Sequence, residues 1–305
     1  MDAASAASQA VSTGWVLFDA GVGLDEQLAN TDTAAACATR TGGVVGVSLR
    51  LASPPAFSTV QLYSTERAYA RRVLAADRDL LLINMVVPVQ NHHPGNYYPD
   101  NFFVYKADAH APWLRPLPSP LDWIDPSWPW MPHLPGLLHC IGRHENAAIS
   151  RSGDEFFVAN LSMNYVCPTG LLNTGDREEV ADLLLYSSEN NTWEAKRLNL
   201  PADARKEYAN SRWRTDAVFS SGGFACWADY HRGILRYDLS SDGSNLGFVR
   251  FPGIQMWHDD HGVPSPLRTV SVVGDDGGFL KFVESTMAAI DPARAPLAAQ
   301  SVPGF

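Results

Sequence analysis

Four short apolar runs separated by three turn-rich gaps make up the segment Trp213–Pro252. The runs have the length of β-strands, and the gaps hold Gly222-Gly223, His231-Arg232-Gly233 and Ser241-Asp242-Gly243, which are typical of tight turns. The runs are Thr215–Phe219, Phe224–Tyr230, Ile234–Leu239 and Leu246–Phe251. The segment therefore predicts one antiparallel sheet of four strands, which is the size of a propeller blade or half of a sandwich.

The second half of this pattern occurs three times in the chain. Phe102–Pro118 and Leu183–Pro201 resemble Ile234–Pro252, because each has an apolar run ending in Tyr, a polar turn, and a strand that closes on Leu-Pro or Phe-Pro. Tyr186 and Tyr237 are 51 residues apart, close to the repeat of roughly 40–50 residues found in propeller blades. The repeat predicts an all-β fold, a β-propeller-like array of four-stranded antiparallel sheets.

Further strands are expected upstream, together with two helical exceptions. The expected strands are Val44–Leu51, Thr59–Ser64, Asp79–Val87, Ala147–Arg151 and Glu155–Asn160. Apolar residues spaced three and four apart predict a helix over Thr65–Ala76, and a short helical stub is expected near Thr174–Val180.

The hydrophobic pattern also sets the expected domain limits. We expect a disordered leader over residues 1–13, a single domain over 14–285 and a low-complexity tail over 286–305. Because apolar patterning stops after Glu284, the array is expected to be incomplete or truncated at its C-terminal end. An unclosed last sheet leaves a strand edge that can pair with another chain.

Composition excludes several classes of function. The formal net charge of −10 argues against a nucleic-acid surface, which needs clustered Lys and Arg. No run approaches the ~18 apolar residues of a membrane span, and the N-terminus lacks the apolar core of a secretory signal. The four cysteines never form a Cys-x-x-Cys pair and are expected to be free thiols. We therefore expect an intracellular protein of the cytoplasm, the nucleus or both, without organelle targeting.

A proline-rich insertion at Ser119–Pro135 carries Trp123, Trp128 and Trp130. Its prolines exclude a central strand or a helix, so it is expected to be a loop. Bare indoles are costly in water. Two interpretations remain open: the indoles cover the end of the sheet stack, or they bind a ligand or a partner protein.

Metal-ligand candidates occur in two polar turns. The loop His258-Asp259-Asp260-His261 holds two imidazoles and two carboxylates that could bind zinc, although a solvated acidic turn is the favoured interpretation. His92 and His93 at a predicted hairpin tip are a similar case. We expect no cofactor.

Catalytic signatures do not occur in the sequence. There is no Gly-x-Ser-x-Gly string and no phosphate-binding loop. Asp216, Asp229 and Asp238 lie at expected strand ends, where a carboxylate typically accepts backbone N–H bonds across a turn.

The stretch Trp213–Asp238 resembles the plant domain-of-unknown-function family 1618 (DUF 1618), which is expanded in grasses. A related run, Gly277–Val283, follows at the expected distance, and the resemblance covers roughly residues 14–285. The matching residues include Trp213, Asp216, Trp227, Asp229, Tyr230, Gly233 and Asp238. The resemblance implies a β-propeller-like domain similar to those attached to F-box proteins, with no assigned activity and with a structural role for these residues.

Three functions are compatible with these patterns. The first is a non-enzymatic scaffold that binds another protein through the tryptophan-rich insertion. The second is an enzyme or binder of a small ligand or metal, which would use the central channel of a propeller. The third is a truncated copy that acts only by pairing its open strand edge with itself or with a full-length relative.

Overall fold

The structure is a computed structural model of the 305-residue chain. It describes residues 17–25, 31–39, 42–52, 56–66, 69–86, 100–108, 110–119, 146–166, 178–204, 213–240, 246–253, 268–273, 279–284 and 298–303. Contacts divide the chain into two compact units, Met1–Leu74 with Asp79–Ser119, and Ala75–Arg78 with Pro120–Phe305.

The first eight strands form one sheet with two halves, called sheets A and B here. Sheet A has the order β2 (Ala35–Ala38), β3 (Val44–Arg50), β4 (Phe57–Ser64) and β1 (Leu17–Asp25). Sheet B has the order β5 (Tyr69–Asp77), β6 (Leu80–Val86), β7 (Asp100–Lys106) and β8 (Trp113–Pro116). The halves meet where β1 pairs in parallel with β4 and, at Gly21 and Arg72 alone, antiparallel with β5.

Alternation of side chains builds the core of this first unit. Along β4 the residues Ser58, Val60 and Leu62 are buried, while the residues between them are half-buried or exposed. The buried faces of sheets A and B share one apolar cluster, in which Val47 and Leu62 come from sheet A and Ile83 and Phe103 from sheet B.

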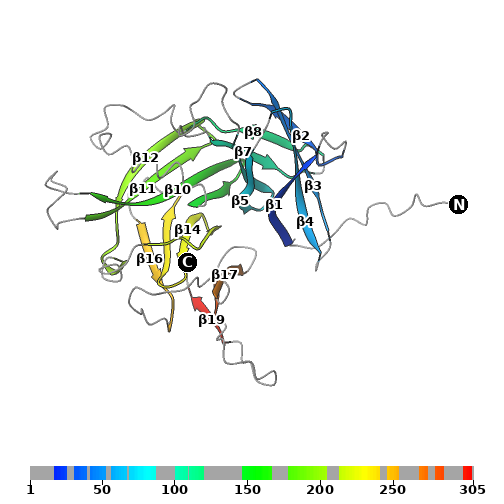
Figure 1. The fold of residues 1–305 in the computed structure, drawn as a ribbon. Coiled ribbons are helices and arrows are strands. Elements are labelled where there is room, and N and C mark those ends of the chain that lie inside the picture. Colours follow the sequence, from blue (N-terminus) through cyan, green and yellow to red (C-terminus); the bar gives the residue numbers. More distant parts are fainter. Residues whose placement is uncertain are drawn as a thin grey trace, which may run out of the picture. The chain divides into compact units, whose positions relative to one another are not determined.

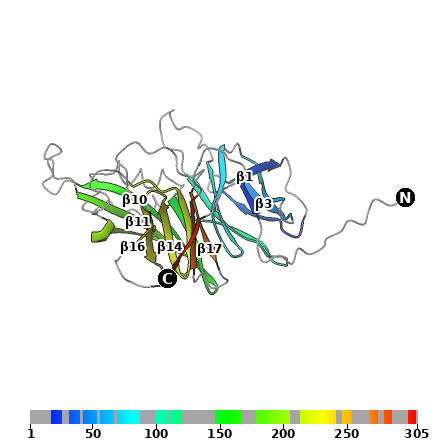
Figure 2. The same ribbon diagram turned by 90° about the horizontal axis from the view of Figure 1, so that it is seen from below.

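The second unit contains three antiparallel sheets, coloured green, yellow and orange to red in Figures 1 and 2. Sheet C is β9 (Ala147–Ser152), β10 (Glu155–Val166), β11 (Glu178–Ser187) and β12 (Thr192–Asn199). Sheet D is β13 (Ala217–Ser221), β14 (Phe224–Asp229), β15 (Gly233–Asp238) and β16 (Leu246–Arg250). Sheet E is β17 (Arg268–Val273), β18 (Phe279–Glu284) and β19 (Ala298–Pro303).

Two apolar clusters join these sheets. Sheets C and D share a cluster that includes Leu183, Trp227 and Leu235. Sheets D and E share a second cluster, in which the rings of Phe251 and Phe282 stack with centroids 4.1 Å apart. Each face of sheet D therefore contributes to a different core, because Cys226 and Ala228 face sheet E while Trp227 faces sheet C.

The predicted fold class is confirmed at the level of its sheets. The described chain is almost wholly β, and sheets C and D are four-stranded and antiparallel as the repeat predicts. All four strands expected between Thr215 and Phe251 form in one sheet. The closed or open circular arrangement of a propeller stays a prediction.

The predicted helix over Thr65–Ala76 is wrong, because Tyr69–Asp77 form strand β5. A tight turn at Arg78, with φ of 55°, leads from β5 directly to the buried strand β6, which pairs with it. Pairing with a buried neighbour outweighs the helical spacing of a few apolar residues. The expected stub near Thr174–Val180 is also wrong where it is described, since Glu178 begins β11.

The predicted leader, domain and tail can be compared with the described residues only in part. The expected leader lies outside them. The expected tail contains β19, which pairs along its whole length with β18. The single domain expected over 14–285 stays a prediction. Among the described residues, no helix has the length and apolar character needed to cross a membrane.

Candidate functional site

Among the residues that the structure describes, a dense charged network lies at the turn between β14 and β15. The side chain of Asp229 is 2% exposed, and its Oδ1 accepts a hydrogen bond from the backbone N–H of His231 at 2.9 Å. Its Oδ2 accepts two more, from the backbone N–H of Arg214 at 3.1 Å and from Nη1 of Arg232 at 2.7 Å. One carboxylate therefore joins the segment before β13 to the turn after β14.

Arg232 is as deeply buried as its partner, with 4% of its side chain exposed. Its backbone N–H donates to the carbonyl of Asp229 at 2.9 Å, and its carbonyl accepts from the N–H of Phe251 at 3.1 Å. Taking two charges out of water is expensive, and only close pairing with further hydrogen bonds offsets that cost. Asp229 and Arg232 have both the close pairing and the further hydrogen bonds.

Asp216 lies beside this pair. Its backbone N–H donates to the carbonyl of Ala228 at 2.8 Å, and its Oδ2 accepts from the N–H of Tyr230 at 2.9 Å. Arg214 Nε is 3.6 Å from Oδ1 of Asp216. Burial, reinforced by the neighbouring charge of Asp229, raises the pKa of the Asp216 carboxyl, although the bond from Tyr230 acts in the opposite direction.

Arg268, the first residue of β17, ties sheet E to the same turn. Its Nη1 donates to the carbonyl of Tyr230 at 2.8 Å and lies 3.4 Å from Nδ1 of His231. The turn is thus held from three directions, by Asp229, by Asp216 and by Arg268.

Gly233 begins β15 where two backbones approach closely. A Cβ at this position would lie 2.2 Å from the carbonyl oxygen of Val249 and 2.9 Å from Cα of Arg250, both in β16. Real Cβ atoms do not occur that close to backbone atoms, so the pairing of β15 with β16 requires glycine here.

The remaining motif residues also make contacts inside the protein. Trp227 is fully buried, and its Nε1 donates to the carbonyl of Asn146 next to sheet C at 2.7 Å. Trp213 Nε1 donates to Oγ1 of Thr215 at 3.0 Å. Asp238 Oδ1 accepts from both the backbone N–H and the hydroxyl of Ser240, which makes a local turn.

A second network, between sheets C and D, involves a lysine and a buried tyrosine. Lys196 on β12 donates to the hydroxyl of Tyr237 on β15 at 3.3 Å, and it pairs with Glu194 at 3.1 Å. Burial acts to lower the pKa of Lys196, but the bonds to Glu194 and Tyr237 outweigh it and the pKa is raised. Lys196 is therefore held as a cation.

The two described cysteines are free thiols with little nucleophilic character. Burial raises the pKa of Cys226 to about 12 and that of Cys37 to about 11. Because the thiolate is the reactive form, both side chains behave as small apolar groups at neutral pH.

Within the described ranges, no group of three or more His, Cys, Asp or Glu could hold a metal ion. Several predicted candidates lie outside these ranges, and the structure places none of them. They are Trp123, Trp128, Trp130, His92, His93 and the loop His258, Asp259, Asp260 and His261.

Sequence reasoning missed three of the contacting residues, Lys196, Arg232 and Arg268. Arg232 stands in a turn whose polar residues indicate solvent exposure, and only its position three residues after Asp229 could have pointed to an ion pair. Arg268 and Lys196 contact residues 38 and 41 positions away, so no local pattern reveals them.

Comparison with known proteins gives a family without an assigned activity. No match is found among curated proteins. The family described as "Protein of unknown function (DUF1618)" matches residues 227–300, from within β14 into β19. This match confirms the resemblance to the family over residues 227–300.

Proposed function

We propose that this protein is a non-enzymatic scaffold that binds another protein. The observation that carries the proposal is the inward direction of the network around Asp229. Arg232 pairs with Asp229, the carboxylates of Asp229 and Asp216 accept backbone hydrogen bonds, and the side chains of Asp216, Asp229 and Arg232 are 2–4% exposed. Charges used in this way hold strands together and are not presented to a substrate.

The site of partner binding is proposed to be the insertion that carries Trp123, Trp128 and Trp130. Tryptophan is enriched among the residues that dominate binding energy at protein interfaces. The free thiols of Cys37 and Cys226 support a reducing compartment, such as the cytoplasm or the nucleus.

The test is affinity purification of the tagged chain from an extract of cells that express it, followed by mass spectrometry and metal analysis. We expect a reproducible protein partner that is lost when all three tryptophans are changed to alanine. Trp113→Ala, which removes an indole from β8, is the matched control. A partner set that is unchanged in the triple variant, with the fold intact, contradicts the proposal.

A second candidate function is pairing through the open edges of sheet E. Sheets C and D have four strands each, whereas sheet E has three among the described residues, with β17 and β19 at its edges. An unpaired edge is a template for strand addition. A proline that blocks an edge belongs in β19, for example at Ser301, because the central strand β18 pairs with both β17 and β19. This function predicts that the protein self-associates as its concentration rises and that Ser301→Pro abolishes the self-association. A protein that stays monomeric at all concentrations excludes the function.

A further inference from the structure

The hairpin between β9 and β10 carries a serine in an acidic sequence. Ser152 ends β9, Gly153 and Asp154 form the turn, and Glu155 begins β10. In the sequence, Ser152 is the one serine or threonine that is followed by carboxylates at both the second and the third position. Protein kinases select substrates in part by such charge patterns, and a cationic substrate groove recognises carboxylates that follow the target hydroxyl.

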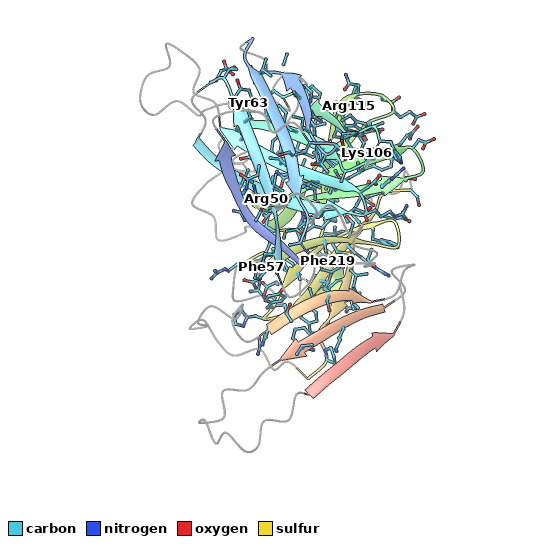
Figure 3. The ribbon with its side chains drawn as sticks, turned by 90° about the vertical axis from the view of Figure 1, so that its right-hand side faces the viewer. Arg50, Phe57, Tyr63, Lys106, Arg115 and Phe219 are labelled. Carbon is cyan, nitrogen blue, oxygen red and sulfur yellow. The ribbon has the colours of Figure 1, made fainter. Side chains whose placement is uncertain are left out.

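The turn exposes this serine to solvent. Ser152, Gly153 and Asp154 are all exposed, and the φ of 62° at Gly153 is typical of the first position of a tight hairpin turn. A Cβ built on Gly153 would meet no atom of the described chain within 4 Å. Glu155 is opposite Ser152 in the register, so the two side chains lie on the same face of the hairpin, which is part of the green ribbon in Figure 3. The hydroxyl and the carboxylates are therefore accessible together.

The residue before this serine holds the end of another strand. The backbone N–H of Arg151 donates to Oδ2 of Asp77 at 2.7 Å, and Ala75–Arg78 belong to the same compact unit as β9. Nε of Arg151 donates to the carbonyl of Gly153 at 2.8 Å. The bond that attaches Asp77 to β9 is therefore one residue away from Ser152.

A phosphate on Ser152 would weaken this attachment. The ionisable side chains of residues 77–78 and 151–155 are three carboxylates and two guanidiniums, those of Asp77, Asp154, Glu155, Arg78 and Arg151. A phosphoserine adds about −1.5 to −2 charges at pH 7. Consecutive Cα atoms are ~3.8 Å apart, so the phosphate acts on Asp77 over a distance comparable with the Debye length, ~8 Å at physiological salt. Repulsion between the phosphate and the Asp77 carboxylate therefore opposes the bond to the Arg151 amide.

We propose that Ser152 is phosphorylated by a protein kinase that recognises acidic residues, and that the phosphate releases Asp77 from the backbone of β9. The kinase transfers the γ-phosphoryl group of ATP to Oγ of Ser152. The bond between Oγ and phosphorus forms, the bond between the γ-phosphorus and the bridging oxygen breaks to leave ADP, and the hydroxyl proton passes to a base of the kinase. The inference goes beyond the scaffold function and does not depend on it.

The test incubates the whole chain with ATP and a purified kinase that requires acidic residues after its target serine, and mass spectrometry then locates the phosphate. We expect phosphate on Ser152, and Ser152→Ala should remove it. Asp154→Asn combined with Glu155→Gln should slow the incorporation about tenfold or more. Ser240→Ala is the matched control and should leave the incorporation unchanged, because Ser240 is an exposed serine with a carboxylate at the second following position but not at the third.

Hydrogen exchange of the phosphorylated protein tests the effect on Asp77. The amide of Arg151 should exchange about tenfold faster or more once it has lost its acceptor, while the amides of β14 should not change. Asp77→Ala should give the same increase without phosphate. The inference is overturned if no phosphate is incorporated at Ser152, or if the incorporation does not depend on Asp154 and Glu155. A phosphate on Ser152 that leaves the exchange of the Arg151 amide unchanged also overturns it.

Discussion

Asp229 and Arg232 form an ion pair inside a turn of four residues, with 2.7 Å between Oδ2 and Nη1 and almost no exposure of either side chain. Asp229 also accepts two backbone hydrogen bonds, so its charge is supported from the backbone as well as from Arg232. The pair therefore fixes the path of the chain between β14 and β15.

Removing Arg232 alone should be strongly destabilising. Arg232→Leu leaves the buried carboxylate without its countercharge, and we expect a loss of about 3–5 kcal/mol in the free energy of unfolding. The double variant Asp229→Asn with Arg232→Leu should recover part of this loss, because a neutral amide needs no countercharge. Urea unfolding of the wild type, of Arg232→Leu and of the double variant measures both the loss and its recovery. A double variant less stable than Arg232→Leu contradicts the role given to the charge.

Gly233 gives a prediction based on sterics alone. Gly233→Ala places a methyl group 2.2 Å from the carbonyl oxygen of Val249, and backbone there cannot move without disturbing the pairing of β15 with β16. We expect a loss of about 1–3 kcal/mol in the free energy of unfolding. Gly247→Ala is the matched control, since its methyl group meets the flexible side chain of Arg236 at 3.0 Å. Equal losses for the two variants contradict the prediction.

The pH dependence of stability should reveal Asp216. Its pKa is raised in the folded protein from an ordinary value of 3.8, so the folded state binds the proton more tightly than the unfolded state. The favourable contribution is therefore full below pH 3.8 and is lost as the pH rises through the folded pKa. Asp216→Asn keeps an oxygen acceptor for the N–H of Tyr230. Its stability relative to the wild type should therefore increase as the pH rises from 3.8 through the folded pKa of Asp216. Urea midpoints measured from pH 3.5 upward test this, and a difference that does not vary with pH refutes it.

The two described thiols should resist modification in the folded protein. With the pKa of Cys226 raised to about 12, roughly one thiol in ten thousand is ionised at pH 8. In a background where Cys140 and Cys167 are changed to serine, we expect slow labelling by a disulfide reagent, and rapid labelling of both remaining thiols once urea unfolds the chain. Rapid labelling of the native protein identifies an exposed thiolate that the structure does not have.

Local patterns in the sequence were sufficient for sheet D. Its alternating runs and turn residues predict β13 to β16 within one or two residues, because each strand pairs with the next one along the chain. The parallel pairing of β1 with β4 has no such local signal, since it joins strands far apart in sequence. β19 was also missed, because the short run Ala298–Pro303 lacks the alternation of apolar and polar residues that marks a half-buried strand.

In the candidate site, too, the local sequence predicts contacts within a turn but not contacts between sheets. The positions of Asp216 and Asp229 at strand ends indicate bonds to turn backbone, and the structure contains such bonds. The contribution of Arg268 depends on sheet E packing against sheet D, which is set by the shared core around Phe251 and Phe282. Contacts between sheets follow from tertiary packing, and the local sequence of either partner does not encode them.

Arg268 therefore provides a specific test of how sheet E is attached. Arg268→Ala removes the bond to the carbonyl of Tyr230 and leaves that carbonyl without this donor, while the stacked rings of Phe251 and Phe282 remain. We expect faster amide hydrogen exchange in β17 and β18, with exchange in β14 little changed, because the ion pair of Asp229 still holds the turn. Arg268→Lys can still donate to the carbonyl of Tyr230. Its amide exchange in β17 and β18 should therefore be faster than that of the wild type and slower than that of Arg268→Ala. Arg214→Ala is the control, since its exposed side chain lies beside Asp216 and makes no bond to sheet E among the described residues. If Arg268→Ala and Arg214→Ala give the same exchange in β17, the guanidinium of Arg268 does not hold the sheet, and the apolar cluster alone attaches it.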